Sequence, residues 1–306
     1  MNIDSLRLFL RIAQLGGVSR AASDLGLSAA SASARLAKLE AEVGARLFHR
    51  MTRAVSLTTD GAAFLPYAES VLETLDQGIG AIVGRAAEPA GNLRMTMPGS
   101  FGRMHVIPAL GDFARRYPKV TLDLRISDEV LDVVEGAFDL IVRNTELTDS
   151  TMVARKLASD RHVLIASPNY LDAHGAPETP AELEGHASVI LHSMNRWEFT
   201  NGTVVYPKAS LRINDGEAMR LAIEAGMGIG LKSVWNAYES LRSGALVEVL
   251  PEHPLLTKTA IWALYPAGRL VPPKVRAMID FLVDLYTPVP PWELSLERAG
   301  ETTEGH

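Results

Sequence analysis

The stretch over residues 18–61 constrains the fold of this chain more than any other segment. A short helical pattern begins at Ser19 and breaks at Gly26, and a second one begins at Ser28 and ends near Val43. Serine at a helix start caps free backbone N–H groups, and glycine permits a left-handed turn. Two short helices around a tight turn, followed by a small ribbon and a longer helix, predict a winged helix-turn-helix.

The second helix of the pair has an apolar face and a free face. Leu36, Leu39 and Val43 recur at helical spacing and indicate the side that packs on the core. The free face carries Ser31, Arg35 and Lys38, and the small residues around them suit the roughly 12 Å major groove of DNA. The small residues are Ala29, Ala30, Ala32 and Ala34.

Residues 45–61 predict a two-stranded wing, because an apolar pair is followed by basic and hydroxyl residues and then by alternation. We place His49, Arg50, Thr52 and Arg53 at its tip, where guanidinium groups would meet phosphates or a narrow minor groove. A single surface arginine usually only keeps a protein soluble. The inference therefore depends on the combination of these residues with the preceding helix.

The charge distribution agrees with binding to nucleic acid at one end of the chain. The first 60 residues hold eight Arg or Lys and five Asp or Glu, a net charge of +3, whereas the whole chain has a net charge of −6. A basic N-terminal part followed by an acidic remainder is typical of a protein that binds DNA through its N-terminal part only.

These residues resemble the DNA-binding domain of LysR-type transcriptional regulators. The similarity lies in LRLFLRIAQLGGVSRAASDLGLS, ARLAKLEAEVGARLFHR and SLTTDG, over some sixty positions. Many members place Gln-Pro after the capping serine and an arginine further along, where this chain has Ala29, Ala30 and Ala34. The resemblance therefore leaves Ser28, Ser31, Ser33 and Arg35 as candidates for contacts in the groove.

Composition and length limit the remaining possibilities. With 306 residues and 47% hydrophobic content, the chain is long enough for two or three globular units. It has no cysteine, which excludes disulfides and thiolate chemistry. We find no apolar run of about 18 residues and no leader pattern. We expect a cytoplasmic, nucleoid-associated protein without a membrane partner.

A long helix should run from Thr58 to about Arg85. An apolar stripe repeats along it at steps of three or four residues: Phe64, Ala68, Val71, Leu75, Ile79 and Ile82. A second copy of the chain could cover this stripe, as in the linker helix of the resembled family, or it could pack on its own protein. Pro66 should bend the helix, and residues 86–91 predict a hinge.

Beyond the hinge, short apolar runs alternate with helical patterns, which predicts an α/β fold with a mainly parallel sheet. We expect two lobes, the first over about 91–166 plus 267–286 and the second over about 167–266. This arrangement matches the family's effector-binding domain, which is similar to periplasmic binding proteins. The predicted domains are 1–59 (winged helix-turn-helix), 60–90 (linker), 91–286 (effector binding) and 287–306 (disordered tail).

A cleft between two such lobes is the usual place for a ligand. Ser100 should begin a helix, where it would either bind an anion or only cap the helix, and the resemblance implies an effector contact. Arg143 could pair with the same anion or with a carboxylate of the protein. The further candidates for the effector site are Phe101, Gly102, Ser127, Phe199 and Trp235.

Several motifs with possible chemistry are not supported by their context. GMGIGLKS at 226–233 has Leu231 where a phosphate loop needs glycine, and it follows a helix, so we interpret it as a helix-to-strand turn. GSFG at 99–102 has Pro98 where a nucleophile elbow needs glycine. The eight histidines show no metal-binding spacing. We expect no metal, no cofactor and no catalytic residues.

The sequence therefore predicts a regulator that is not an enzyme: it binds double-stranded operator DNA and responds to a small effector, chiefly an organic anion. The resemblance implies a homodimer or homotetramer and admits RNA polymerase as a partner. Two alternatives remain open at this level. One is a two-lobed enzyme with an accessory DNA-binding domain, and the other is an architectural DNA binder without a ligand.

Overall fold

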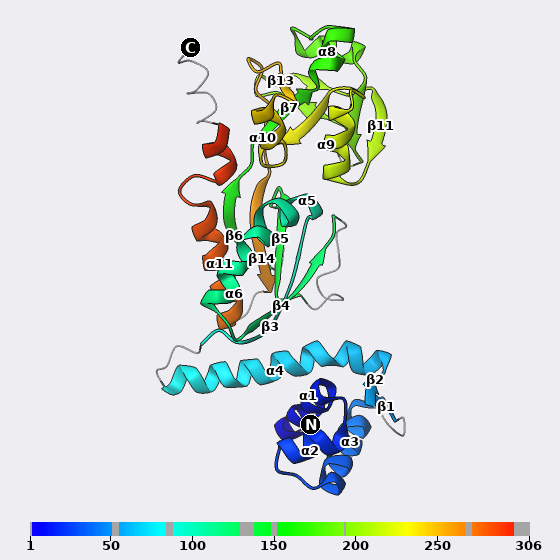
Figure 1. Cartoon of the computed structure of the whole chain (residues 1–306), viewed down its shortest axis with the longest axis vertical. Helices are drawn as coiled ribbons and strands as arrows, with labels where there is room; N and C mark the ends of the chain where they lie inside the picture. Colours follow the sequence, from blue (N-terminus) through cyan, green and yellow to red (C-terminus); the bar gives the residue numbers. More distant parts are fainter. Residues whose placement is uncertain are drawn as a thin grey trace. The chain divides into compact units, whose positions relative to one another are not determined.

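The computed structural model describes residues 2–50, 55–83, 88–128, 138–147, 152–192, 194–266 and 271–296 (Figure 1). Contacts divide the chain into two compact units. Unit 1 holds Met1–Gly91 with Leu270–Pro273, and unit 2 holds Asn92–Arg269 with Lys274–His306. Each unit is described separately below.

Unit 1 is a winged helix-turn-helix with a long helix attached. Its elements are α1 (Ile3–Leu15), α2 (Val18–Asp24), α3 (Ala29–Val43), β1 (Phe48–Arg50), β2 (Val55–Leu57) and α4 (Thr59–Val83). The core is apolar side chains from all three short helices and the wing, with Leu8, Phe9, Ile12, Leu39 and Leu47 fully buried. Phe9 lies at the centre, since its ring contacts Phe48 at 5.2 Å and Phe64 at 5.4 Å between centroids.

The turn between α2 and α3 follows the sequence prediction in part. Gly26 adopts a left-handed conformation with φ 67. The glycines that end α1 and α3, Gly16 and Gly44, do the same with φ 62 and φ 80. The prediction that Ser19 caps α2 is wrong, because α2 begins at Val18 and Gly17 occupies the cap without a side-chain hydrogen bond. Ser28 does cap α3, accepting from the Ser31 N–H at 3.1 Å.

Helix α4 begins one residue later than predicted because Thr58 is its cap, with Oγ1 accepting from the Gly61 N–H at 2.9 Å. The start of the apolar stripe packs on the unit itself: Ala68 is buried and Phe64 lies against the core. Val71 is 46% exposed. Self-packing therefore accounts for the first turns of the stripe, and the side chains of Ile79 and Ile82 lie outside the described residues.

Lobe 1 of unit 2 is built on a five-stranded sheet in the order β4-β3-β5-β14-β6. The strands are β3 (Gly91–Met97), β4 (Val120–Ile126), β5 (Leu140–Thr145), β6 (Met152–Ser159) and β14 (Ala260–Pro266). Its helices are α5 (Gly99–Phe101), a π-helical turn (Gly102–Val106), a 3-10 turn (Ile107–Ala109), α6 (Leu110–Arg116) and α11 (Pro273–Tyr286). Helices α6 and α11 lie side by side, with Phe113 and Phe281 at 5.3 Å (Figure 1).

Lobe 2 contains smaller sheets, one in the order β12-β7-β13 and others pairing β11 with β8 and β10 with β9. Its strands are β7 (His162–Ala166), β8 (Ser188–Leu191), β9 (Trp197–Glu198), β10 (Val204–Val205), β11 (Ala209–Ile213), β12 (Gly230–Ser233) and β13 (Val247–Val249). Its helices are α8 (Pro168–His174), a 3-10 helix (Pro180–Gly185), α9 (Gly216–Glu224) and α10 (Val234–Ser243). Trp197 and Phe199 are buried in its core.

The two lobes are present, but their sheets and bounds differ from the prediction. The lobe 1 sheet is mixed, because β3 runs parallel to β5 whereas β14 runs antiparallel to β5 and β6. The β12-β7-β13 sheet of lobe 2 is antiparallel throughout. The chain crosses to lobe 2 at residues 160–161, and it has returned to lobe 1 by residue 260. Strand pairing decides these bounds: β7 has its partners in lobe 2 and β14 has its partners in lobe 1.

The segment after α11 was predicted to be disordered from residue 287, and for residues 287–296 this is wrong. Residues 291–296 are helical, and Trp292 is 1% exposed. Its ring lies 4.6 Å from that of His105 and 5.3 Å from that of Tyr286. Burying one large aromatic side chain stabilises this segment more than the polar residues around it favour disorder. Residues 297–306 lie outside the described part of the chain.

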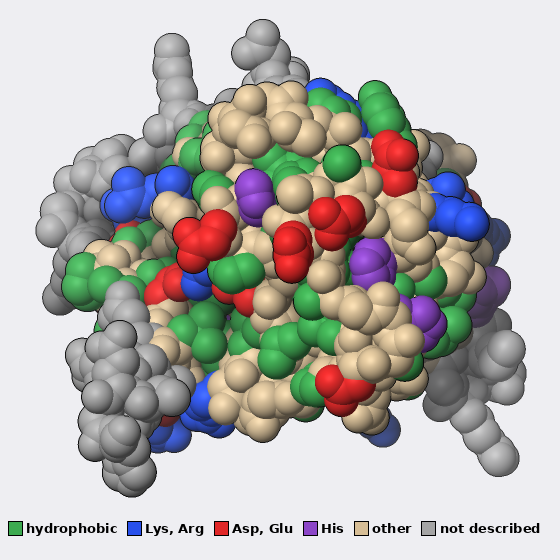
Figure 2. Space-filling view, turned by 90° about the horizontal axis from the view of Figure 1, so that it is seen from above, with side chains coloured by type: hydrophobic (Ala, Val, Ile, Leu, Met, Phe, Trp, Pro, Cys, Tyr) green, Lys and Arg blue, Asp and Glu red, His purple; other side chains and the backbone are tan. Residues whose placement is uncertain are grey.

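The surface of unit 2 reflects the acidic balance of the sequence. Figure 2 shows the end of this unit that carries α8 and β13, with carboxylates and histidines near the middle of the face and Lys or Arg toward its margin. Within the described residues, no helix has both the length and the apolar character needed to span a bilayer.

Candidate DNA-binding surface and effector cleft

Helix α3 presents a smooth outer face opposite the core of unit 1. Ala32, Leu36 and Leu39 are buried, so Ala32 serves packing and does not belong to the slim outer face as predicted. Ser31, Ser33 and Lys38 are exposed, as are the alanines at 29, 30 and 34. Ser28 is exposed too, although its hydroxyl oxygen already accepts the capping hydrogen bond.

Arg35 lies at the edge of that outer face. Its Nη1 is 3.8 Å from Asp4 Oδ2, with both side chains partly exposed. An exposed ion pair of this length contributes little to stability, so the guanidinium can leave Asp4 for a phosphate or a base at small cost.

The predicted wing residues lie partly in the strands. His49 lies in the middle of β1, paired with Ser56 of β2, so its placement at the tip is wrong, whereas Arg50 ends β1 opposite Val55, next to the connection between the strands. His49 is exposed. Residues 51–54, which include Thr52 and Arg53, lie outside the described residues, as does the side chain of Arg50.

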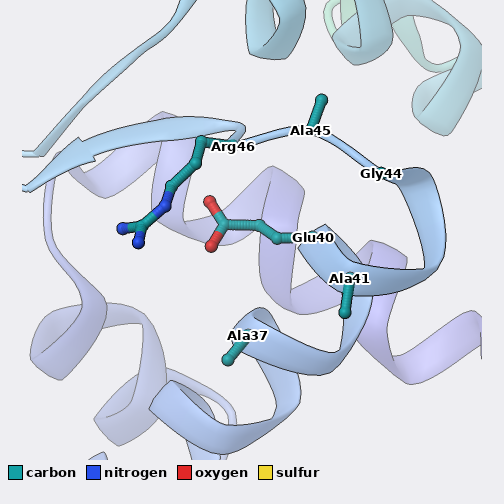
Figure 3. Close-up of a pocket in the computed structure, with 6 residues that line it drawn as sticks. All are labelled: Ala37, Glu40, Ala41, Gly44, Ala45 and Arg46. Carbon is teal, nitrogen blue, oxygen red and sulfur yellow. The ribbon is translucent and has the colours of Figure 1, made fainter.

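The carboxylate of Glu40 holds the wing to the recognition helix. It reaches from α3 toward the segment leading into β1, with Arg46 nearby (Figure 3). Oε1 accepts from the N–H groups of Leu47 at 2.9 Å and Phe48 at 3.3 Å, and Glu40 is only 9% exposed. A carboxylate that accepts backbone N–H groups in a buried position makes strong, directional hydrogen bonds. Glu40 therefore fixes where the wing starts relative to α3.

Replacing Glu40 with Ala should lower the free energy of unfolding by about 1–3 kcal/mol, because two buried N–H groups lose their acceptor. Glu40→Gln should cost less, since its amide oxygen can still accept. Urea unfolding measures both, with Lys38→Ala as the exposed control on the same helix. Equal effects at positions 38 and 40 would show that Glu40 does not hold the wing.

Unit 2 contains a cleft of about 680 Å³, which is within the size range of small-molecule sites. It lies where elements of both lobes meet. Lobe 1 contributes residues after β3, after β4 and at the end of β5, and lobe 2 contributes β12, the start of α10 and the residues before α9. Its apolar lining includes Leu191, Met194, Leu231 and Leu264.

Four of the seven predicted effector residues line this cleft: Ser100, Ser127, Arg143 and Trp235. Ser100 is 3% exposed, and its Oγ has no hydrogen-bond partner in the described part of the chain. Arg143 is half-buried beside Asp128, and burial lowers its pKa while the charge of Asp128 opposes that shift. Trp235 is 7% exposed with its Nε1 unpartnered.

The other three predicted residues serve packing and do not line the cleft. Phe101 is 1% exposed and belongs to an aromatic cluster with His105, Trp235, Tyr286 and Trp292. A Cβ on Gly102 would lie 2.9 Å from Met97, so this glycine permits close packing on β3. Phe199 is in the core of lobe 2.

The helical segment that follows β3 runs from Gly99 through the π-helical and 3-10 turns to Arg116, and the Gly99 N–H at its start donates to Asp128 Oδ1 at 2.8 Å. The carboxylate of Asp128 therefore already occupies part of the positive end of the predicted helix. The lysine of the rejected phosphate-loop pattern supplies a cation instead. Lys232 lines the cleft, although nothing in the sequence analysis selected it.

Lys232 is a buried cation in the middle of β12, 4% exposed. Its Nζ donates to the Gly216 carbonyl oxygen at 2.7 Å, and among the described residues no carboxylate lies within ion-pair distance of it. Burial lowers its pKa to about 8, with the more distant Glu217 opposing the shift. A lysine interrupting the apolar run GIGLKS was the sequence signal, because buried charges are normally paired.

Lys232 and Ser100 converge on one place. A Cβ added to Gly216 would lie 3.1 Å from Ser100 Oγ and 3.3 Å from Lys232 Nζ. The hydroxyl of one lobe and the ammonium of the other therefore border the same small space. Gly216 itself, at the start of α9, leaves this space open.

A group of hydrogen-bonding residues beside the cleft resembles a catalytic triad in composition only. Asp160 Oδ2 lies 3.1 Å and Thr259 Oγ1 lies 3.3 Å from the same atom, Nε2 of His162. A triad needs its carboxylate and its hydroxyl on different ring nitrogens, so that the histidine can accept a proton from one side while the other orients it. This group is suited to structural support.

A winged helix-turn-helix unit joined to a two-lobed α/β unit with a ligand-sized, cation-bearing cleft defines an effector-responsive DNA-binding regulator. Family models agree with this class. Residues 3–62 match the bacterial regulatory helix-turn-helix protein, lysR family, and residues 86–287 match the LysR substrate binding domain. The chain belongs to the LysR family of transcriptional regulators.

Individual relatives match over nearly the whole chain. An HTH-type transcriptional regulator of Xanthomonas campestris pv. campestris (strain 8004) is 35% identical over 294 residues, covering 92% of this chain and 85% of the relative. The HTH-type transcriptional regulator DmlR of Escherichia coli (strain K12) is 32% identical, covering 97% and 98%. The structure of CrgA, a LysR-type regulator from Neisseria meningitidis, is 29% identical with a TM-score of 0.60, covering 93% and 98%.

Proposed function

We propose that this regulator binds operator DNA through the outer face of α3 and the wing, and that a small organic anion in the cleft of unit 2 switches it. The main support for an anionic effector is Lys232, a buried ammonium without a carboxylate at ion-pair distance among the described residues. A charge in that position is costly unless something pairs with it. A bound carboxylate would supply the partner.

Ser100 and Arg143 complete the proposed anion site. The Ser100 hydroxyl has no partner among the residues that the structure describes, and it borders the same space as Lys232 Nζ. Arg143 adds a second cation to the lining, with Asp128 beside it. Ser127 and Trp235 line the remaining wall, and the buried indole N–H has no acceptor among the described residues. Together these groups favour an anionic head on a partly apolar ligand.

On the DNA side, the proposal assigns groove contacts to Ser31, Ser33, Arg35 and Lys38, with Ser28 near the phosphates. The N-terminal turns of a recognition helix reach base edges, and the alanines there leave room for close approach. His49, Arg50, Thr52 and Arg53 of the wing would contact the backbone of the DNA.

Effector binding can switch the protein only through a difference in affinity between two arrangements. The cleft is lined from both lobes, so a ligand that contacts both favours the arrangement in which they approach each other. Because its partner is genomic DNA, we place the protein at the nucleoid.

We propose a homo-oligomer, in which a second copy covers the exposed side of α4 that carries Val71. Two DNA-binding units would then read half-sites about one helical turn of DNA apart. RNA polymerase completes the set of partners, as the enzyme on which an operator-bound regulator acts.

The anion site predicts a specific pH dependence. Isothermal titration with small carboxylates and their uncharged amides should show binding of the carboxylates alone. Affinity should be highest below pH 8 and fall up to tenfold per pH unit above it, because the Lys232 pKa of about 8 in the free protein rises when an anion binds. Tight binding of the amides, or a flat profile to pH 9.5, would contradict the anion. Turnover of a bound compound would instead indicate an enzyme.

A further inference from the structure

Several residues that line the cleft have a buried polar atom without a hydrogen-bond partner among the described residues. The four atoms are Ser100 Oγ, Asn144 Oδ1, Trp235 Nε1 and Asn236 Oδ1. Each costs free energy in the unliganded protein. Two are amide oxygens, which only accept hydrogen bonds. Lys232 and Ser100 can bind an anion. They do not supply the hydrogen-bond donor that the two unpartnered amide oxygens lack.

The orientation of the Asn144 amide is fixed by its surroundings. Its Nδ2 lies 2.8 Å from Asp160 Oδ2 and 3.2 Å from Ser233 Oγ. A carboxylate accepts and does not donate, so the NH₂ group of Asn144 must face Asp160. The amide cannot turn over without placing its oxygen against a negative charge. The unpartnered atom of Asn144, a residue of the cleft lining, is therefore its oxygen.

Asp160 keeps its charge because several donors surround it. Its side chain is fully buried, which raises its pKa, but hydrogen bonds from His162, Asn144 and Thr259 outweigh burial and the net shift is downward. Oδ2 lies 2.8 Å from Thr259 Oγ1 and 3.0 Å from Ser233 Oγ. The carboxylate is thus ionised at neutral pH and holds Asn144 in one orientation.

The same carboxylate ties together the segments that join the lobes. Asp160 and His162 lie at the first crossover, and Thr259 lies at the return crossover. Asn144 belongs to β5 of lobe 1, and Ser233 ends β12 of lobe 2. A ligand group that binds Asn144 therefore contacts a residue held by both crossovers and both lobes.

We propose that Asn144 Oδ1 forms a donor-reading subsite, so that the effector is an organic anion that also carries a hydroxyl or ammonium group, and that Asp160 is its positioning residue. This inference rests on the proposed anion site. Asn236 on α10 also lines the cleft, is 1% exposed, and has a second unpartnered amide oxygen, Oδ1, that can accept. The ligand class is accordingly a hydroxy acid or an amino acid.

The test compares carboxylates that differ only in the donor. One series is glutarate, 2-hydroxyglutarate and glutamate, and the other is 3-phenylpropionate, 3-phenyllactate and phenylalanine. Isothermal titration of the full-length protein, up to 10 mM ligand, should show that a donor-bearing member of at least one series binds about tenfold or more tightly than its parent. The preferred member tells hydroxyl from ammonium.

Two variants test the roles of the residues. Asn144→Leu should remove the preference for the donor while the parent acid still binds within about threefold of its wild-type affinity. Asp160→Asn should reduce the preference as well, because Asn144 is then free to present its NH₂ group. If Asp160→Asn does not fold, Thr259→Val removes one donor to the same carboxylate without touching the cleft lining.

The outcomes separate this inference from the proposed function. If the parent acids bind and the donor makes no difference in either series, the subsite is overturned and the anion site stands. An unchanged preference in Asn144→Leu would also overturn it. If no carboxylate of either series binds at 10 mM, both the anion site and the subsite are overturned.

Discussion

Replacing Ala34 with Glu should weaken binding of a DNA fragment from upstream of the gene by at least about 100-fold. Ala34 lies in the middle of the exposed face of α3, opposite the buried Ala32, Leu36 and Leu39. A carboxylate there would meet the negative field of the groove and fill the space that alanine leaves. A like-charge contact across an interface costs several kcal/mol, which is more than a hundredfold in affinity.

Ala41→Glu is the matched control. Ala41 is also exposed and is seven residues further along, on the same face of α3 but near its C-terminal end. Because the N-terminal part of a recognition helix enters the groove, this change should cost only a few fold. Glutamate is a good helix former, so both variants should melt like the wild type. Equal losses of affinity at 34 and 41 would contradict the docking of α3 through its first turns.

Replacing Lys232 with Met should abolish the response to carboxylates and at the same time stabilise unit 2. The pKa of Lys232 falls from 10.5 to about 8 on folding, which corresponds to roughly 3 kcal/mol of unfavourable burial of the charged form. Losing the hydrogen bond to the Gly216 carbonyl costs about 1 kcal/mol. The net gain of about 2 kcal/mol should raise Tm by about 5 °C for a unit of this size.

The pH dependence of this gain has a definite sign. Between pH 8 and 10.5 the unfolded chain keeps the proton of Lys232 and the folded chain releases it, so stability of the wild type from this group rises with pH. The advantage of Lys232→Met should therefore be largest below pH 8 and shrink toward pH 10. Differential scanning calorimetry across that range measures it. A variant that is less stable than the wild type at pH 7 would contradict the claim that burying the Lys232 ammonium has a net cost in stability.

The contrast between a stabilised protein and a lost response has a physical reason. Binding sites keep polar groups unpaired so that a ligand can pair with them, and the empty protein is less stable as a result. Ile229, just before β12 and in the core of lobe 2, offers a control, because Ile229→Leu preserves volume and charge away from the cleft lining and should change neither property greatly.

Much of unit 1 was predictable because its information is local. The cap at Ser28, the left-handed turn at Gly26 and the apolar spacing of Leu36 and Leu39 each lie within one or two turns of helix. What could not be predicted was the partner of each side chain. Glu40 looks like any surface carboxylate in the sequence, yet it binds the backbone of the wing.

The cleft was harder to predict because its residues come from distant segments. Sequence position after β3 led to Ser100, which lines the cleft, but Phe101 and Gly102 beside it face the interior. Lys232 is easy to miss in the sequence, because the glycines before it at 226–230 suggest a phosphate loop. Rejecting that motif also removes the reason to consider the lysine. Its position inside an apolar strand was the better signal.

The order of residues by itself determined the winged helix-turn-helix, the long helix and the alternation of strands and helices, because periodicity and caps act over a few neighbouring residues. Tertiary structure alone decided which strands pair, where the chain crosses between lobes, and that Trp292 is buried. It also decided that Lys232, Ser100 and Asn144 share one cleft. Such pairings depend on contacts between residues far apart in the chain. Burial then decides what chemistry each charged or amide side chain can take part in.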